Sequence, residues 1–181
     1  MNDNTTETGR TCPACGEGIL QPKTERQTVE YHGQSGELVL RFAVCDTCGA
    51  ELTNAEDARH NKRAMNAFKK RVDGLLTGDE IREFRERFNL TQKLAAQLIG
   101  GGEVAFSRYE SDDVVQSAAM DTALRLCINS PYNLLTLAQS KDIQLPKDVA
   151  SPINTQISKC AGPGRHDPSK NPGNYQIHET S

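Results

Sequence analysis

Apolar and polar positions divide the chain into a short part with strand-like alternation and a longer part with helical periodicity. Residues 28–31 and 37–44 alternate as strands do, and residues 32–36 between them include two glycines that suit a hairpin connection. From residue 56 onward, apolar residues recur three and four positions apart, which is the spacing of one helix face. The pattern therefore predicts an α+β chain in which a small β-hairpin precedes a series of helices.

Capping signals indicate where these helices begin. Thr53–Glu56 and Thr77–Glu80 match the capping box, in which a hydroxyl and a carboxylate satisfy the first free amides of a helix. Thr91 and Ser117 are suited to cap two more helices, and Pro131 suits the first turn of a last one. We therefore expect one linking helix, followed by an all-α domain of the five-helix type.

Two of the predicted helices, over residues 92–99 and 103–110, are separated by Gly100–Gly102, which permit a sharp turn. This is the helix-turn-helix arrangement, whose second helix enters the major groove of double-stranded DNA. We assign Phe106 and Tyr109 mainly to the core. The predicted DNA-binding residues are the exposed ones that remain: Gln92, Lys93, Gly102, Glu103, Val104, Ser107 and Arg108.

Each of these side chains suits a particular contact. Arg108 can donate two hydrogen bonds to a guanine, and Val104 could pack on a thymine methyl group. Gln92 and Lys93 begin their helix and are suited to grip phosphates. Glu103 could accept from a cytosine amino group or support the helix N-terminus. A salt bridge within the domain is the alternative role for Arg108.

Four of the six cysteines form two CxxCG motifs, Cys12 with Cys15 and Cys45 with Cys48. Each motif can present two thiolates to one ion, and two motifs complete a tetrahedral site. Four thiolates fill every coordination position, so we predict one structural Zn²⁺ per chain and no chemistry at the metal. A redox pair is the alternative, but such a pair is not normally doubled with a glycine after each motif.

The remaining cysteines and two histidines are not expected to bind metal. Cys127 lies in an apolar helical stripe and is predicted to be buried, and Cys160 is predicted to be a free thiol. His32 and His60 are expected at the surface and would replace a ligand only if a cysteine failed to reach. Residues 1–52 hold few large apolar side chains, so the metal should supply much of their folding free energy, on the order of 10 kcal/mol.

Composition and charge refine this division. The net charge is −4 over residues 1–55, +3 over 56–76 and −3 over 77–140. Since Lys and Arg supply most nonspecific DNA affinity, the helix-turn-helix domain should depend on a local basic face and on homodimerisation. The basic linking helix could contact phosphates or a partner, or could be merely solvated.

No signal peptide and no apolar run of the roughly 18 residues that span a membrane are evident, so we expect a cytoplasmic protein without membrane contact. Proline, glycine and polar residues dominate the C-terminal segment, which we expect to be mostly disordered. The predicted organisation is a flexible N-terminus (1–10), a zinc domain (11–52), a linking helix (53–76), a helix-turn-helix and dimerisation domain (77–140) and a tail (141–181).

The order CPxCG, hairpin, CxxCG, linking helix and GGGEVAFSRYE over residues 100–110 resembles the MqsA (YgiT-type) antitoxin family of prokaryotes, over roughly residues 11–140. The resemblance implies a zinc domain that neutralises a RelE-like, mRNA-cleaving toxin, and a helix-turn-helix dimer that represses its own operon. It also implies that the four paired cysteines bind zinc and that Arg108 contacts a base. Val104 departs from the family's usual asparagine, and Leu94 from a usual glutamate.

Two other classes of function stay open at this point. A stand-alone zinc-containing repressor of a phage, plasmid or host operon would have the same DNA-binding part and no toxin partner. An enzyme that uses CxxC thiols would need an accessible thiolate, and we find no other catalytic arrangement, so a non-enzyme is expected. The acidic balance of residues 1–55, to which a four-thiolate zinc site adds −2, favours a basic, RNA-cutting partner.

Overall fold

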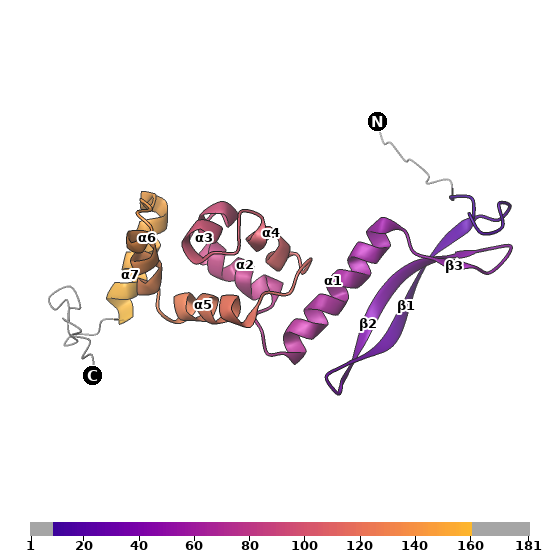
Figure 1. Cartoon of the computed structure of the whole chain (residues 1–181), viewed down its shortest axis with the longest axis horizontal. Helices are drawn as coiled ribbons and strands as arrows, with labels where there is room; N and C mark the ends of the chain where they lie inside the picture. The colour runs from indigo at the N-terminus through magenta and orange to yellow at the C-terminus, as the bar shows by residue number, and fades with distance from the viewer. Residues whose placement is uncertain (1–8, 161–181) are drawn as a thin grey trace, which may run out of the picture.

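A computed structural model describes residues 9–160 and has a β-hairpin at one end and a group of helices at the other (Figure 1). This confirms the predicted α+β fold class, and none of the described helices is both long and apolar enough to span a membrane. The elements are β1 (Leu20–Tyr31), β2 (Gln34–Cys45), β3 (Glu51–Leu52), α1 (Ala55–Val72), α2 (Gly78–Arg87), α3 (Gln92–Ile99), α4 (Ala105–Glu110), α5 (Ala118–Asn129), α6 (Tyr132–Ser140) and α7 (Lys147–Cys160).

The hairpin strands are longer than the sequence pattern predicts. Their antiparallel register runs without interruption from Leu20 opposite Cys45 to the turn. The turn residues His32 and Gly33 have φ of 49° and 74°, which is the backbone of a type I′ turn. Most of β1 is exposed on both faces, so it lacks the apolar alternation that would have marked it as a strand.

Helix α1 packs against β2 and closes a small core. We call β1, β2, β3 and α1 the hairpin half of the molecule, and the helices from α2 onward the helical half. Phe68 of α1 is buried together with Leu38 and Phe42 of β2. The helix is capped by Asn54, whose side chain accepts a hydrogen bond of 2.8 Å from the amide of Asp57. The capping box predicted from Thr53 is therefore wrong by one residue, because asparagine caps a helix at least as well as threonine.

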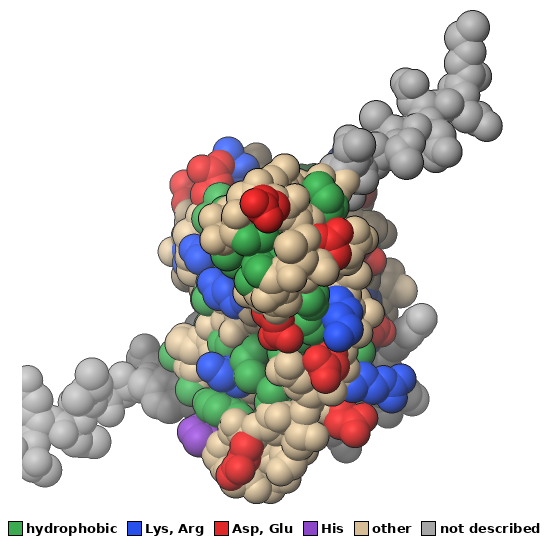
Figure 2. Space-filling model, turned by 90° about the vertical axis from the view of Figure 1, so that its right-hand side faces the viewer, with side chains coloured by type: hydrophobic (Ala, Val, Ile, Leu, Met, Phe, Trp, Pro, Cys, Tyr) green, Lys and Arg blue, Asp and Glu red, His purple; other side chains and the backbone are tan. Residues whose placement is uncertain are grey.

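The helical half has a continuous apolar core to which α2, α3, α4, α5, α6 and α7 all contribute. The predicted capping box of Thr77 and Glu80 is confirmed, and so are the caps at Thr91 and Ser117. Cys127 is buried in this core, as predicted, and burial raises the pKa of its thiol to about 11. Figure 2 views the molecule from its other end, where the hairpin lies. On that face, charged side chains of both signs surround small apolar areas.

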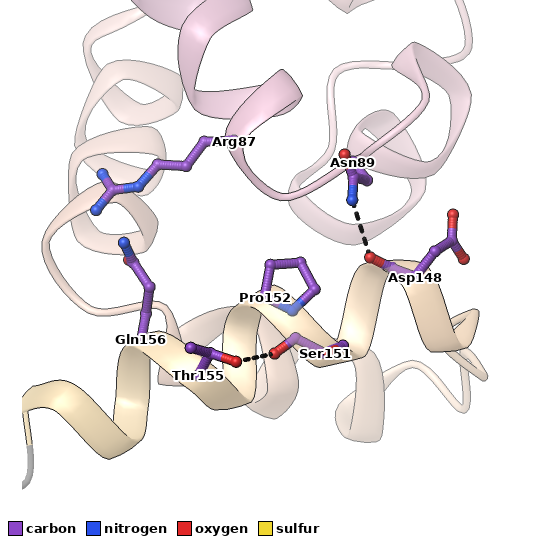
Figure 3. Close-up of a pocket in the computed structure, with 7 residues that line it drawn as sticks. All are labelled: Arg87, Asn89, Asp148, Ser151, Pro152, Thr155 and Gln156. Carbon is purple, nitrogen blue, oxygen red and sulfur yellow. Dashed lines mark hydrogen bonds between the residues drawn. The ribbon is translucent and has the colours of Figure 1, made fainter.

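The segment predicted as a mostly disordered tail from residue 141 instead contains α7. Val149 and Ile153 are buried in the helical core, and Ile157 packs against it. Asn89 also donates a hydrogen bond of 3.0 Å to the carbonyl of Asp148, at the edge of a shallow pocket between α2 and α7 (Figure 3). The prediction is therefore wrong for residues 147–160. The Cys160 side chain and residues 161–181 lie outside the described part.

Candidate functional site: a four-cysteine cluster and a helix-turn-helix

The two CxxCG motifs bring their four cysteines into one cluster, in which all the sulfur atoms lie within 4.8 Å of one another. The Sγ atoms of Cys12 and Cys48 are 3.8 Å apart, and those of Cys15 and Cys45 are also 3.8 Å apart. A tetrahedral ion with metal–sulfur bonds of about 2.3 Å requires sulfur–sulfur edges of about 3.8 Å. The cluster therefore fits a metal ion, and both of these short contacts join one motif to the other, unlike a redox pair within a motif.

The backbone of each motif turns so that amides face the sulfur atoms. Gly16 and Gly49 have φ of 75° and 71°, a region that favours glycine. The amide of Gly18 donates to Cys15 Sγ over 3.4 Å. The amides of Thr47 and Cys48 both donate to Cys45 Sγ, also over 3.4 Å. These hydrogen bonds hold the two sulfur atoms in place and stabilise them as thiolates, the form that binds a metal.

Backbone amides near the sulfur atoms, together with burial and contacts between the cysteines, shift the pKa values of the thiols. The amides of Gly18 and Glu17 lower the pKa of Cys15 to about 6. The amide of Cys48, followed by that of Thr47, lowers the pKa of Cys45. The Ala50 amide lowers the pKa of Cys48, but hydrogen bonds with the other cysteines and burial outweigh it and raise that pKa to about 12. A bound cation would displace this last proton, because only thiolates ligate metals.

The helix-turn-helix consists of α3, a glycine turn and α4. Gly100, Gly101 and Gly102 have φ of 122°, 95° and 86°, so the predicted sharp turn depends on glycine at each position. A Cβ atom at Gly101 would also lie 2.9 Å from the Cβ of Ala105. Helix α4 begins at Ala105, two residues later than predicted, and its N-cap residue Val104 makes no capping hydrogen bond through its side chain.

Six of the seven predicted DNA-binding residues are exposed: one lies in the first turn of α3, three lie in the turn that precedes α4 and two lie on α4. Val104 is 63% exposed, and Arg108 forms no ion pair with any described residue, so its alternative role in a salt bridge has no support within residues 9–160. Lys93 Nζ lies 3.2 Å from Glu103 Oε1. The exposed residues are Lys93, Gly102, Glu103, Val104, Ser107 and Arg108.

Gln92 differs from these six, because it is half-buried and held by Glu110, a residue that the sequence reasoning missed. Gln92 Nε2 donates over 2.9 Å to Glu110 Oε2. The buried Glu110 carboxylate also accepts hydrogen bonds of 2.6 and 3.0 Å from Arg85, and the bond with Glu110 raises the pKa of Arg85. Glu110 thus fixes α4 against α2 and α3. Glu110 lies four residues after the buried Phe106 and therefore on the same face of the helix. This spacing was the signal in the sequence that its side chain would point into the protein.

A polar interface joins α1 to the end of α4 and to the segment that follows it. The side chain of Lys70 is fully buried, and its Nζ donates over 2.7 Å to the Tyr109 carbonyl and 2.6 Å to Asp112 Oδ1. Arg63 makes two hydrogen bonds to Asp113, of 2.7 and 3.0 Å, and holds the pKa of that carboxyl at about 2. Part of the positive charge of the linking helix is therefore used inside the protein.

The chain is similar to known antitoxins over both candidate sites. Residues 9–137 match the family described as the MqsA antitoxin component of bacterial toxin-antitoxin systems. Antitoxin MqsA of Escherichia coli (strain K12) is 27% identical over 122 residues, which cover 66% of this chain and 93% of that relative. The match ends before α7, so this helix lies outside the similarity to the family.

Proposed function

The chain belongs to the MqsA antitoxin family, the antitoxin component of bacterial toxin-antitoxin systems, and from this premise we propose how its two halves divide that role. The hairpin half holds one structural zinc ion and neutralises a RelE-like, mRNA-cleaving toxin. The helix-turn-helix half binds operator DNA as a homodimer and represses the operon that encodes it. The observation that carries this proposal is that the matched residues 9–137 include both the four-cysteine cluster and the helix-turn-helix.

Zinc is proposed because of the ligand set and its geometry. Four sulfur donors at tetrahedral spacing are typical of structural zinc, whose closed coordination shell leaves no position for water or substrate. Such a site stabilises a fold and performs no catalysis, which agrees with a regulatory protein that is not an enzyme. The four thiolates and Zn²⁺ carry a net −2, in addition to the −4 of residues 1–55. This charge suits a basic, RNA-binding toxin in the cytoplasm.

The DNA-binding role is proposed from the surface of α4. Arg108 and Ser107 project from a short helix that Glu110 fixes in place, and Val104 lies exposed just before it. An arginine without an internal ion pair among the described residues is available for a guanine. A six-residue helix in a domain of net charge −3 gives modest affinity alone, so we propose two half-sites bound by a homodimer.

Two variants separate the proposed activities in one co-expression experiment. Cells would express the toxin encoded beside the gene of this chain, together with the full chain and a reporter fused to the operon promoter. Cys45→Ser should abolish rescue of growth, whereas Arg108→Ala should keep rescue and lose repression. Repression of the reporter without any rescue by the unmodified chain would instead identify a stand-alone repressor. Rescue that persists in Cys45→Ser would overturn the role of the metal site.

A further inference from the structure

The two outer edges of the β-hairpin differ in whether other parts of the protein pair with them. The outer edge of β2 is covered, because β3 pairs with Ala43 and Val44. Next to these residues, the side chain of Asn61 from α1 accepts a hydrogen bond from the Arg41 amide and donates one to the Arg41 carbonyl, both of 2.8 Å. The outer edge of β1 has no such cover along most of its length.

The direction of the backbone groups of β1 follows from this arrangement. Arg41 gives both of its backbone groups to Asn61, so it exchanges none with its partner Thr24 on β1. Paired residues in an antiparallel ladder alternate between bonded and non-bonded pairs. Thr24 and every second residue from it therefore direct their N–H and C=O groups away from β2. Pro22, which has no N–H, falls in this series, as does Leu20, whose amide donates over 2.9 Å to the Arg10 carbonyl.

The result is an open strand edge from Pro22 to Glu30. The outward amides are those of Thr24, Arg26, Thr28 and Glu30, and no residue within 9–160 pairs with them. The register contains no bulge that would turn the edge aside, and the side chains along it are exposed except that of Val29, which is half-buried. A long, regular and exposed edge is a template for the addition of another strand.

We propose that the toxin binds by adding an extended strand to this edge of β1, an inference that rests on the proposed neutralisation of a toxin by the hairpin half. An antitoxin must present a surface to its toxin, and the acidic charge of residues 1–55 suits a basic partner. Along the edge, Glu25, Arg26 and Glu30 alternate in sign, which opposes indiscriminate strand pairing and selects a partner strand of complementary charge.

Amide hydrogen exchange tests the proposal directly, because it reports each backbone N–H separately. The full ¹⁵N-labelled chain would be measured by NMR alone and with the purified toxin encoded beside its gene. The amides of Lys23, Glu25 and Gln27, which bond to β2, should be protected in both states. The amides of Thr24, Arg26, Thr28 and Glu30 should exchange freely in the isolated chain and slow by more than about tenfold in the complex.

The outcomes separate this inference from the function on which it rests. A complex in which the four outward amides still exchange freely would overturn strand addition and leave toxin neutralisation in place. Failure to form any complex would overturn both. Protection of the outward amides in the isolated chain would also contradict the inference, since the edge would then be occupied by the chain itself or by a second copy.

A pair of variants at one position provides an independent test. Thr28→Pro removes an outward amide and should leave the bonds to β2 intact, as Pro22 does on the same edge. Thr28→Val keeps the amide and a β-branched side chain. We expect Thr28→Pro alone to weaken toxin binding at least about tenfold, with zinc content and operator binding unchanged. Equal toxin affinities of the two variants would contradict the proposal. If Thr28→Pro loses zinc, its hairpin is disturbed, and the hydrogen-exchange measurement on the unmodified chain then tests the proposal instead.

Discussion

The hairpin half and the helical half of the molecule differ in what stabilises them. Within residues 9–72, which form the hairpin and α1, the buried side chains are those of Cys12, Leu38, Phe42, Cys45, Phe68 and Lys70, and two of these six are candidate metal ligands. The helical half buries a continuous apolar cluster that reaches from Leu76 to Ile153. A small unit with so little apolar burial needs another source of stability, whereas the helical half can fold on its core alone. The halves should therefore respond to different perturbations.

The largest expected effect is the loss of the metal site. Cys45→Ser removes one of the four sulfur donors and should cost the hairpin half up to about 10 kcal/mol, because binding free energy is folding free energy in such sites. NMR should show the loss of the hairpin signals while the helical signals persist. Cys127→Ala, at a cysteine buried in the other half, is the matched control and should keep the metal. A hairpin that stays folded in Cys45→Ser would remove the contrast between the halves.

The second effect concerns the core of the helical half. Ile153→Ala should destabilise this half by about 3 kcal/mol, since the side chain is fully buried among α7 and the helices before it. Urea unfolding followed by circular dichroism measures the change. Asn154→Ala, at the exposed neighbouring position, should have almost no effect. Equal effects of the two substitutions would show that α7 does not belong to the core.

Local features could be predicted from the sequence because their causes lie within a few residues. The CxxCG spacing brings two thiolates together through one turn, and Thr77, Thr91 and Ser117 cap helices that begin directly after them. Helix α7 was missed because Pro152 and its polar neighbours resemble a loop. Its helical signal was the recurrence of Val149, Ile153 and Ile157 every fourth residue.

Long-range polar contacts could not be predicted in the same way. The pairing of Lys70 with Asp112 joins residues 42 positions apart, and nothing local distinguishes Lys70 from the other basic residues of α1. The placement of Glu110 beside Arg85 likewise depends on how α4 packs on α2. The sequence indicated which residues are exposed on α4, but not that Gln92 is held by a carboxylate.

The third effect tests how the two halves are joined. Lys70→Met removes the ammonium group and leaves the Tyr109 carbonyl and the partly exposed Asp112 carboxylate without their partner, which should cost about 2 kcal/mol. Thermal unfolding should then separate into two transitions, because α1 would no longer be fixed to the helical half. Lys62→Met, at an exposed position of the same helix, is the control. No difference between the two variants would mean that the interface contributes nothing to the coupling.

A smaller effect, on binding and not on folding, is expected at Arg108. Arg108→Ala should weaken operator binding about tenfold or more, because a bidentate contact with guanine is lost, and should leave the unfolding free energy unchanged. Fluorescence anisotropy with labelled operator DNA measures this loss. Arg59→Ala, which removes an exposed arginine from α1, should change the affinity less. The reverse order would move the DNA contact to the linking helix.

The smallest effect is a dependence of stability on acid pH. Arg63 holds the pKa of Asp113 at about 2, below the usual value for an aspartate. The folded state therefore gains stability from this carboxylate above about pH 4, and the gain is lost as the pH falls through about 2. Asp113→Asn should remove this part of the acid dependence in unfolding curves between these pH values. An unchanged pH dependence would show that the Arg63–Asp113 ion pair is too solvated to contribute to the free energy of unfolding.

Metal analysis of the full chain, purified without added metal, tests the central claim most directly. The account predicts one zinc ion per chain that resists dialysis, together with NMR signals of a folded hairpin. Removal of the ion with a strong chelator should abolish those signals and spare the signals of the helical half. A chain without metal whose hairpin is nevertheless folded would contradict the claim that four sulfur ligands stabilise one half and an apolar core the other.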